Sequence, residues 1–373
     1  MPGIVALVSR RGETWVEAVG TQSFGGAAMR RDTIFRIASM TKPVIAAATL
    51  MLVEECKLRL DDPVDAFLPE LANRQVLKSL ESAVDDTVPA KRSITTRDLL
   101  TFTFGMGAVI VWPARHPIQK AAADLGLAPG PFQLDLTADE FMKRLGALPL
   151  VYQPGERWLY HTGSDVLGVL LARASGQSLA TFLQDHLFGP LGMHNTGFHV
   201  PADKLGRLAG AYMTDPEDKT KLAFFDDARD SRWSKPPAFA AGGGGLVSTA
   251  DDYLAFQRML LHGGRHGGER ILSRAAVELM MSDQLTAEQK QGTELFFGHG
   301  ASWGMGGAVV TRRTDIFATP GRFGWDGGYG TSAHLDPAED MIGILMTQRM
   351  MDSPVAPRVF RDFWTSAYQA FDD

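Results

Sequence analysis

A long apolar segment near the start of the chain places the strongest constraint on its fold. Residues 39–55 are dense in Ala, Leu, Met and Val and include no glycine, which predicts a long, buried helix. Pro43 falls in its first turns, where proline is tolerated because those amides lack a helical partner. Other elements must cover such a helix, and 373 residues with 45% hydrophobic content suffice for one large domain or two interleaved ones.

Both ends of the chain have the pattern of a sheet. Residues 4–9 and 14–19 are apolar, β-branched runs on either side of a short polar turn, which predicts a hairpin. Strand-like runs return at residues 308–311, 332–335 and 341–346, and residues 357–371 predict a closing amphipathic helix. We therefore expect an α/β unit built from residues 1–60 and 238–373, with a helical unit of residues 61–237 inserted between them.

Several helix boundaries carry their own signals. Two pairs have the spacing of a capping box, Thr95 with Asp98 and Thr137 with Glu140. Gly146 and Gly176 are expected to end helices. A glycine run at residues 242–245 precedes a capped helix that begins near residues 248–252 and ends at residues 262–264.

Charge and cysteine content exclude several classes of function. The formal net charge is -6, and Lys and Arg are scattered along the chain, so neither nucleic acid nor a membrane surface is an expected partner. The single cysteine, Cys56, cannot form an intrachain disulfide, and no zinc-type spacing of Cys and His occurs. We expect no metal or cofactor and a cytoplasmic location; a leader or first helix removed upstream stays an open alternative.

Ser39 and Lys42 stand three residues apart at the start of the predicted helix, so their side chains share one face. A serine hydroxyl becomes a good nucleophile when a base takes its proton, and lysine can be that base only when neutral. Lowering a lysine pKa from about 10.4 to about 7.5 costs about 4 kcal/mol. A helix dipole supplies only about 0.3 to 1 kcal/mol, so burial or a second cation must supply the rest. The alternative is that Ser39 caps the helix and Lys42 points to water.

Three segments resemble the serine β-lactamase and penicillin-binding superfamily, especially its class C and family VIII carboxylesterase branches. They are Phe35-Arg36-Ile37-Ala38-Ser39-Met40-Thr41-Lys42, Ile94-Thr95-Thr96-Arg97-Asp98-Leu99-Leu100-Thr101, and the glycine run with its following helix, residues 242–252. The resemblance spans nearly the whole chain. It implies an α+β fold, in which an antiparallel sheet is flanked by helices and a mostly α-helical domain is inserted.

Two further motifs of that superfamily can be placed, and both depart from its pattern. The Y-x-N element falls on Tyr160, with Thr162 in place of the usual Asn. The K-T-G element falls on Trp325-Asp326-Gly327, which the resemblance makes substrate-binding residues. Lactamases of the superfamily use the K-T-G lysine to hold a carboxylate, which a tryptophan cannot do. We therefore expect neutral or hydrophobic esters as substrates in preference to β-lactams.

The resemblance also implies roles for individual groups. Tyr160 joins Lys42 in proton transfer to and from Ser39 and the leaving group, and the two form a coupled system in which neither is assigned as the base. The backbone N–H groups of Ser39 and Gly328 form the oxyanion hole. The alternatives are a buried Tyr160 with a satisfied hydroxyl and a simple turn at the glycines.

A second serine matches a different motif. Ser302 lies in Gly300-Ala301-Ser302-Trp303-Gly304, the G-x-S-x-G pattern of an α/β-hydrolase elbow. An elbow has a helix after its serine, whereas a strand-like run follows here. His334 is also the only histidine after Ser302. We regard this match as accidental.

The remaining candidates have weaker support. His161 could tune Tyr160, although we favour a position in solvent or in packing around the site. Asp326 could meet a polar substrate group or cap a turn. Trp112, Trp233 and Phe104 are candidates for an acyl pocket, with core positions as the usual alternative.

The sequence thus predicts a serine hydrolase that cleaves carboxylic esters through an acyl intermediate on Ser39, with a small-molecule ester as its expected partner. Other reactions of the same fold stay open: an amide or peptide hydrolase, such as a D-amino-acid peptidase or a weak β-lactamase, or an acyltransferase that excludes water. A non-catalytic relative that binds or senses a ligand is the alternative outside enzymes. The set of Ser39, Lys42 and Tyr160 argues against it.

Overall fold

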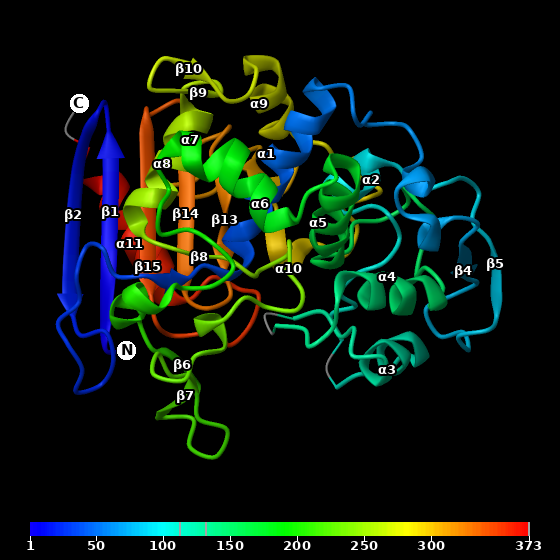
Figure 1. Ribbon diagram of the computed structural model, residues 1–373, viewed down its shortest axis with the longest axis horizontal. Helices are drawn as coiled ribbons and strands as arrows, with labels where there is room; N and C mark the ends of the chain where they lie inside the picture. Colours follow the sequence, from blue (N-terminus) through cyan, green and yellow to red (C-terminus); the bar gives the residue numbers. More distant parts are fainter. Residues whose placement is uncertain (112, 131–132, 372–373) are drawn as a thin grey trace.

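A seven-stranded antiparallel sheet forms one side of the protein in the computed structural model, which describes residues 1–111, 113–130 and 133–371 (Figure 1). Its strand order is β11-β12-β13-β14-β15-β1-β2. The bounds are β1 (Gly3–Arg10), β2 (Glu13–Gly20), β11 (Ala301–Trp303), β12 (Ala308–Val310), β13 (Phe323–Gly327), β14 (Thr331–Asp336) and β15 (Met341–Thr347). The predicted N-terminal hairpin and the C-terminal strands are confirmed, and the two chain ends meet where β1 pairs with β15.

Helices cover both faces of this sheet because its central strands alternate toward two apolar layers. Along β1, Val5 and Leu7 belong to the main core, whereas Ala6 and Val8 pack against the cluster that holds Trp364. The second layer is α11 (Arg358–Gln369), and the first includes α8 (Ala250–Leu261). The predicted antiparallel sheet flanked by helices is therefore confirmed.

The predicted long helix is α1 (Thr41–Glu54), and its residues from Thr41 to Leu50 are all buried. A 3-10 turn, η1 (Ala38–Met40), precedes it. Ser39 lies in this turn and does not cap α1, whose N-cap is Met40. Helix α5 (Thr162–Ser175) packs beside α1, which explains why α1 is apolar on every side.

Residues 61–237 hold most of the other helices; the helices between residues 96 and 147 lie on the side of the molecule away from β1 and β2, whereas those between residues 179 and 191 lie near α8 (Figure 1). They are α2 (Thr96–Leu100), α3 (Pro117–Asp124), α4 (Ala138–Ala147), α5, α6 (Leu179–Leu183), a π turn η4 (Gln184–Phe188) and α7 (Gly189–Leu191), with 3-10 turns η2 (Val64–Ala66), η3 (Pro69–Leu71), η5 (Ala202–Arg207) and η6 (Arg232–Ser234). The same block contains two hairpins, β4 (Gln75–Leu77) with β5 (Thr87–Pro89) and β6 (Ala211–Thr214) with β7 (Leu222–Asp226). The division at residues 60/61 and 237/238 stays a prediction.

Most predicted helix boundaries are confirmed, and one is wrong. Thr95 and Asp98 form a complete capping box, and Gly176 ends α5 with a φ of 71°. Gly146, in contrast, lies inside α4, which continues to Ala147. A Cβ at Gly146 would come within 2.8 Å of the Glu70 carbonyl oxygen, so this glycine serves close packing and does not end the helix.

A short pairing brings the glycine run beside the segment that contains Ser39. Strand β3 (Phe35–Arg36) pairs antiparallel with β8 (Val247–Ser248), so residues close to Ser39 and residues close to the glycine run lie side by side. The remaining elements are β9 (Arg265–His266), β10 (Glu269–Arg270), α9 (Arg274–Met280) and α10 (Glu294–Phe297). Within the described residues, no single helix has the length and apolarity to span a membrane, and one bent pair, α5 with Leu179–Leu191, passes on those two criteria alone.

Candidate active site

Ser39 and Lys42 meet as their spacing predicts. The Lys42 side chain extends from the first turn of α1 and is fully buried. Its Nζ lies 3.0 Å from Ser39 Oγ. The alternative in which Lys42 points to water is therefore wrong.

Burial explains how Lys42 can be neutral. Removal from solvent lowers the pKa of Lys42 to about 7, and the charge of Asp165 opposes this change. The sequence left open whether burial or a second cation lowers this pKa; burial is the cause. A lysine in this environment exchanges protons near neutral pH, as a general base must.

Tyr160 also borders the Lys42 amine. Lys42 Nζ is 4.7 Å from the centroid of the Tyr160 ring, and the Tyr160 hydroxyl also forms a hydrogen bond with Ser39. Its oxygen accepts a hydrogen bond from Trp325 Nε1 at 2.6 Å. Burial raises the pKa of the Tyr160 phenol, and these two bonds oppose the rise. The structure thus brings Ser39, Lys42 and Tyr160 together.

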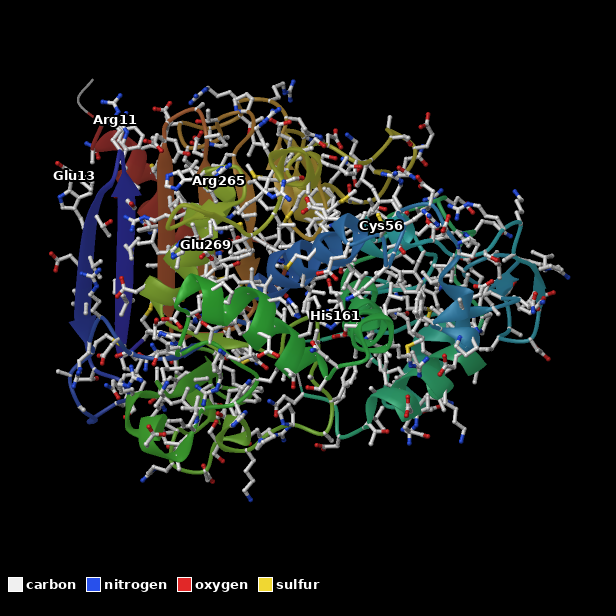
Figure 2. All side chains as sticks on the ribbon, turned by 45° about the horizontal axis from the view of Figure 1, so that its top comes forward. Arg11, Glu13, Cys56, His161, Arg265 and Glu269 are labelled. Carbon is white, nitrogen blue, oxygen red and sulfur yellow. The ribbon has the colours of Figure 1, made fainter. Side chains whose placement is uncertain are left out.

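His161 belongs to the same cluster; of its two predicted positions, packing around the site is confirmed and solvent is wrong. Its Nδ1 lies 3.3 Å from Lys42 Nζ, and its Nε2 lies 3.3 Å from Asp165 Oδ2. Only 12% of the side chain is exposed, and Figure 2 shows it in the interior. Burial, with the nearby Lys42 charge, lowers the pKa of His161.

The glycine run completes the surroundings of Lys42. The Gly243 carbonyl accepts a hydrogen bond from Lys42 Nζ at 2.5 Å, and the Gly243 N–H donates to Asp165 Oδ1 at 2.7 Å. A Cβ at Gly243 would lie 2.8 Å from that same carboxylate oxygen, which explains the glycine. Sequence reasoning missed both Asp165 and Gly243. The available signal was the i,i+4 spacing of His161 and Asp165 at a helix start.

The residues of the K-T-G position lie on β13, against η1. Trp325 lies within hydrogen-bonding distance of Tyr160, as above. Asp326 accepts hydrogen bonds from Ser332 Oγ at 2.6 Å and from His334 Nε2 at 3.2 Å, so its carboxylate is already bonded to β14. A Cβ at Gly327 would collide with the Ile37 carbonyl oxygen, and this glycine lets β13 approach the Ser39 segment closely.

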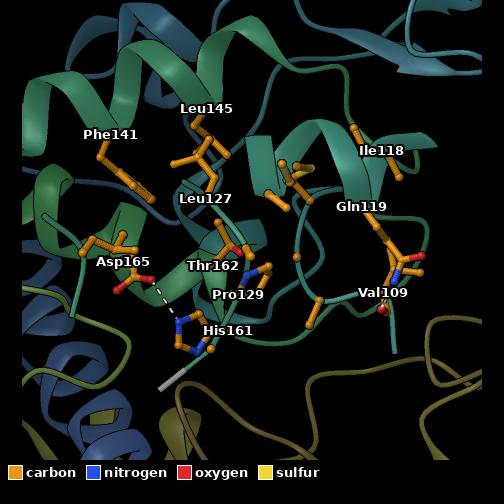
Figure 3. A pocket seen from close by; sticks show the side chains of 18 of the residues that line it. Val109, Ile118, Gln119, Leu127, Pro129, Phe141, Leu145, His161, Thr162 and Asp165 are labelled. Atoms are coloured by element: carbon orange, nitrogen blue, oxygen red, sulfur yellow. Dashed lines mark hydrogen bonds and ion pairs between the residues drawn. The ribbon is translucent and has the colours of Figure 1, made fainter. Parts of the chain in front are cut away.

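Two adjoining cavities flank this cluster. The larger, here called the serine cavity, has a volume of about 600 Å³ and is lined by Ser39, Tyr160, Trp325, Asp326 and Gly328. The other, here called the side cavity, measures about 350 Å³ and lies among α3, α4 and the start of α5 (Figure 3). The two share wall residues, which are Ala108, Ile110, Pro129, Gly130 and His161.

The three aromatic residues considered for an acyl pocket do not line these cavities where the structure describes them. Phe104 is fully buried in the main core. Trp233 is buried in a separate cluster with Tyr329, and its Nε1 donates to the Gly245 carbonyl at 3.0 Å. Both are core residues, so the alternative of core positions holds for them and neither lines the pocket. Trp112 lies outside the described residues.

The surroundings of Ser302 are not those of a nucleophile elbow. It is fully buried in the short strand β11, and β12 follows. Its hydroxyl donates to the Asp283 carboxylate, so the bond involves no histidine. A strand also stands where an elbow needs a helix. Among the described residues, no group of three or more His, Cys, Asp or Glu side chains is placed to hold a metal ion.

Comparisons with known proteins agree with the fold. The family model described as Beta-lactamase matches residues 1–361. Protein Rv1367c of Mycobacterium tuberculosis is 39% identical over 364 residues, covering 95% of this chain and 88% of that protein. Esterase EstB of Burkholderia gladioli is 32% identical over 377 residues, with coverage of 95% and 88%. The solved structure of EstCE1, described as a hydrolase with promiscuous acyltransferase activity, matches with a TM-score of 0.79 at 26% identity, covering 99% of this chain and 94% of that one.

Proposed function

Because the chain belongs to the Beta-lactamase family, we propose that it is a serine hydrolase that cleaves carboxylic esters through an acyl-enzyme on Ser39. The observation that carries this proposal is the contact between Ser39 Oγ and the buried Lys42 Nζ at 3.0 Å. A lysine with a pKa of about 7 can accept the serine proton at neutral pH. The name of EstB, an esterase, supports the reaction class.

In acylation, Ser39 Oγ bonds to the acyl carbon while its proton passes to Lys42 Nζ and the carbonyl electron pair moves onto oxygen. The N–H groups of Ser39 and Gly328 are the proposed donors to that oxyanion; losing one such donor typically costs about 3 kcal/mol. The tetrahedral intermediate collapses, the bond to the alkoxide breaks, and a proton from the coupled Lys42 and Tyr160 pair passes to the leaving oxygen. Water then attacks the acyl carbon in the same way and releases the acid.

The lining of the serine cavity favours neutral substrates. Its described lining residues include Glu294 and Asp326 but no lysine or arginine. The indole of Trp325, at the position of the K-T-G lysine, bonds to Tyr160 and offers no charge. A substrate carboxylate of the β-lactam type would therefore meet acidic groups without a partner, which is unfavourable.

An apolar chain suits both cavities. Leu295, Phe296 and Val355 line the serine cavity, and Ile118, Phe141 and Leu145 line the side cavity. Burial of apolar surface contributes about 0.8 kcal/mol per methylene. We assign the side cavity to the hydrocarbon chain of the ester. The predicted small-molecule partner and cytoplasmic location stay predictions.

Acyl transfer is the second candidate, because the acyl-enzyme is common to both reactions and only the acceptor differs. The description of EstCE1 names both activities for that protein. Hydrolysis of p-nitrophenyl butyrate, with and without an added alcohol, separates them. We expect the unchanged protein to release p-nitrophenol and to yield the free acid as its product. Ser39→Ala should release no p-nitrophenol above background. An ester of the added alcohol as the main product would replace the hydrolase assignment by a transferase one.

The same assay with a chromogenic β-lactam tests the substrate class. We expect its turnover to be at least about 100-fold below that of the ester, since no cation of the described cavity lining meets its carboxylate. Equal turnover of the two substrates would contradict the proposed preference. Ser302→Ala is the matched control for both substrates and is expected to retain full activity.

A further inference from the structure

We propose that His161 and Asp165 act as a pair of positioning residues that turn the lone pair of Lys42 toward Ser39. This inference rests on the proposed function, because it concerns how Lys42 takes the Ser39 proton. It assigns work to two residues outside the Ser39, Lys42 and Tyr160 set.

Among the described residues, three oxygen or nitrogen atoms lie within hydrogen-bonding distance of Lys42 Nζ: Ser39 Oγ at 3.0 Å, His161 Nδ1 at 3.3 Å and the Gly243 carbonyl at 2.5 Å. A neutral amine has two N–H bonds and one lone pair. The Gly243 carbonyl can only accept, so it takes one N–H. If His161 Nδ1 takes the other N–H, the lone pair is left facing the Ser39 hydroxyl.

Asp165 makes His161 Nδ1 an acceptor. Asp165 Oδ2 lies 3.3 Å from His161 Nε2, and a carboxylate placed there favours the tautomer that carries its proton on Nε2. The other ring nitrogen, Nδ1, then holds a lone pair toward Lys42. Figure 3 shows the pair at the edge of the side cavity.

The same carboxylate is fixed from the other side. Asp165 Oδ1 accepts the Gly243 N–H at 2.7 Å, and the carbonyl of that same glycine accepts from Lys42. The contacts therefore close a ring through Lys42, His161, Asp165 and Gly243. Each member restricts the next, so the orientation of Lys42 does not depend on one bond.

The backbone at His161 gives an independent reason to assign it a role. Its φ of 86° and ψ of -68° are those of a γ-turn of the rare, strained type. The Thr162 N–H donates to the Tyr160 carbonyl at 3.3 Å, as such a turn requires. A non-glycine residue held in this way is strained, and such strain clusters at functional sites. The turn directs the neighbouring Tyr160 and His161 side chains to one lysine.

The contact between His161 Nδ1 and Lys42 Nζ bears on a departure from the Y-x-N pattern. Thr162 stands at the Asn position, but the residue that contacts Lys42 is His161, one position earlier. Thr162 instead lines the side cavity. In this chain the residue of the Y-x-N segment that contacts Lys42 at 3.3 Å is thus His161, which is paired with the Asp165 carboxylate.

Two variants of His161 test the positioning role by kinetics. His161→Asn keeps an acceptor near the position of Nδ1 and tolerates positive φ, whereas His161→Leu has no acceptor. We expect the kcat for p-nitrophenyl butyrate to fall about 100-fold in His161→Leu and at most about tenfold in His161→Asn, with KM nearly unchanged. The exposed His262 gives the matched control, and His262→Leu should behave as the unchanged protein. Equal kcat values for His161→Leu and the unchanged protein would overturn the proposal.

Nitrogen-15 NMR of the imidazoles in the unchanged protein tests the tautomer without any substrate, and a variant serves only to assign the signal. We expect His161, assigned by the loss of its signal in His161→Asn, to carry its proton on Nε2 with Nδ1 unprotonated at pH 8. A proton on Nδ1 at that pH would overturn the proposal even if the protein is an esterase. Conversely, failure of Ser39→Ala to abolish ester hydrolysis would refute the proposed function and leave the tautomer result standing. The titratable groups that act on His161 are Lys42 and Asp165. Tyr160 lies beside it in the sequence, and Asp326 acts on Tyr160.

Discussion

Trp325 donates its indole N–H to the Tyr160 hydroxyl oxygen at 2.6 Å, across 165 residues of sequence. The indole ring also packs edge-on against Trp303, with centroids 4.9 Å apart. The tryptophan at the K-T-G position therefore holds the phenol beside Ser39 and fills space that a charged side chain would occupy in the lactamase pattern.

Replacing the indole N–H while keeping an aromatic ring tests this contact. Trp325→Phe is expected to lower kcat for p-nitrophenyl butyrate about tenfold, since one hydrogen bond contributes about 0.5 to 1.5 kcal/mol. The melting temperature should change little, because the ring still packs on Trp303. An unchanged kcat in a folded Trp325→Phe protein would show that the bond does not orient Tyr160.

The pKa of Lys42, about 7, predicts the pH dependence of ester hydrolysis. The neutral amine is the active form, so kcat/KM should rise with pH and reach half its maximum near pH 7. Asp165 raises the pKa of Lys42 by its charge. Asp165→Asn should therefore move this midpoint to lower pH, and the maximal rate should also fall because the His161 tautomer is less restricted.

A pH–rate profile of the unchanged protein and of Asp165→Asn from pH 5 to pH 9 measures both effects. Asp251→Asn is a matched control, since Asp251 pairs with Arg31 on the surface. A midpoint that moves to higher pH in Asp165→Asn would contradict the role of that charge.

The buried lysine also predicts how stability depends on pH. The pKa of Lys42 is lower in the folded protein than the usual value of about 10.4, so between about pH 7 and pH 10 the unfolded chain binds more protons. Stability from this group therefore rises with pH across that window. The free-energy cost of burying the charged Lys42 side chain is fully present below about pH 7. Each tenfold change in its proton affinity corresponds to about 1.4 kcal/mol.

Denaturant unfolding of the protein and of Lys42→Met at pH 7 and pH 10 isolates this contribution. Relative to that of Lys42→Met, the free energy of unfolding of the unchanged protein should increase by a few kcal/mol between pH 7 and pH 10. A difference that is the same at both pH values would mean that Lys42 is not desolvated in the folded state.

Filling the side cavity should change the chain-length preference. Ala122 lies on α3 and lines this cavity. Ala122→Leu is expected to lower kcat/KM for p-nitrophenyl octanoate about tenfold relative to p-nitrophenyl acetate, because the cavity can no longer take the chain. Ala121→Leu, on the same helix but outside the lining, is the control for damage to α3. An equal loss of kcat/KM for acetate and octanoate in Ala122→Leu would mean that the acyl chain does not bind in the side cavity.

Local patterns in the sequence predicted the elements, and spacing on one helix predicted one contact of the site. The alternation at residues 4–9 and the apolar run at residues 39–55 depend on neighbours along the chain, so β1 and α1 were predictable. Ser39 and Lys42 meet because they are three residues apart where η1 continues into α1. Gly146 was misassigned as a helix end because a glycine is needed there for close packing against Glu70, which belongs to another element.

The rest of the site depends on contacts between distant segments. Tyr160 and Trp325 could be placed only through the family motifs, since no local pattern joins them to Ser39. The burial of Lys42, which lowers its pKa, arises where α5 and the glycine run close over α1. His161 and Asp165 were visible as an i,i+4 pair, but only the fold shows that this pair faces Lys42.

The most direct test of the acyl-enzyme is the mass of the peptide that contains Ser39 after brief exposure of the protein to p-nitrophenyl butyrate and rapid acid quenching. We predict a mass increase of one butyryl group on Ser39, lost in Ser39→Ala and retained in Ser302→Ala. A butyryl group on another residue, or labelling that persists in Ser39→Ala, would contradict the assignment of Ser39 as the nucleophile.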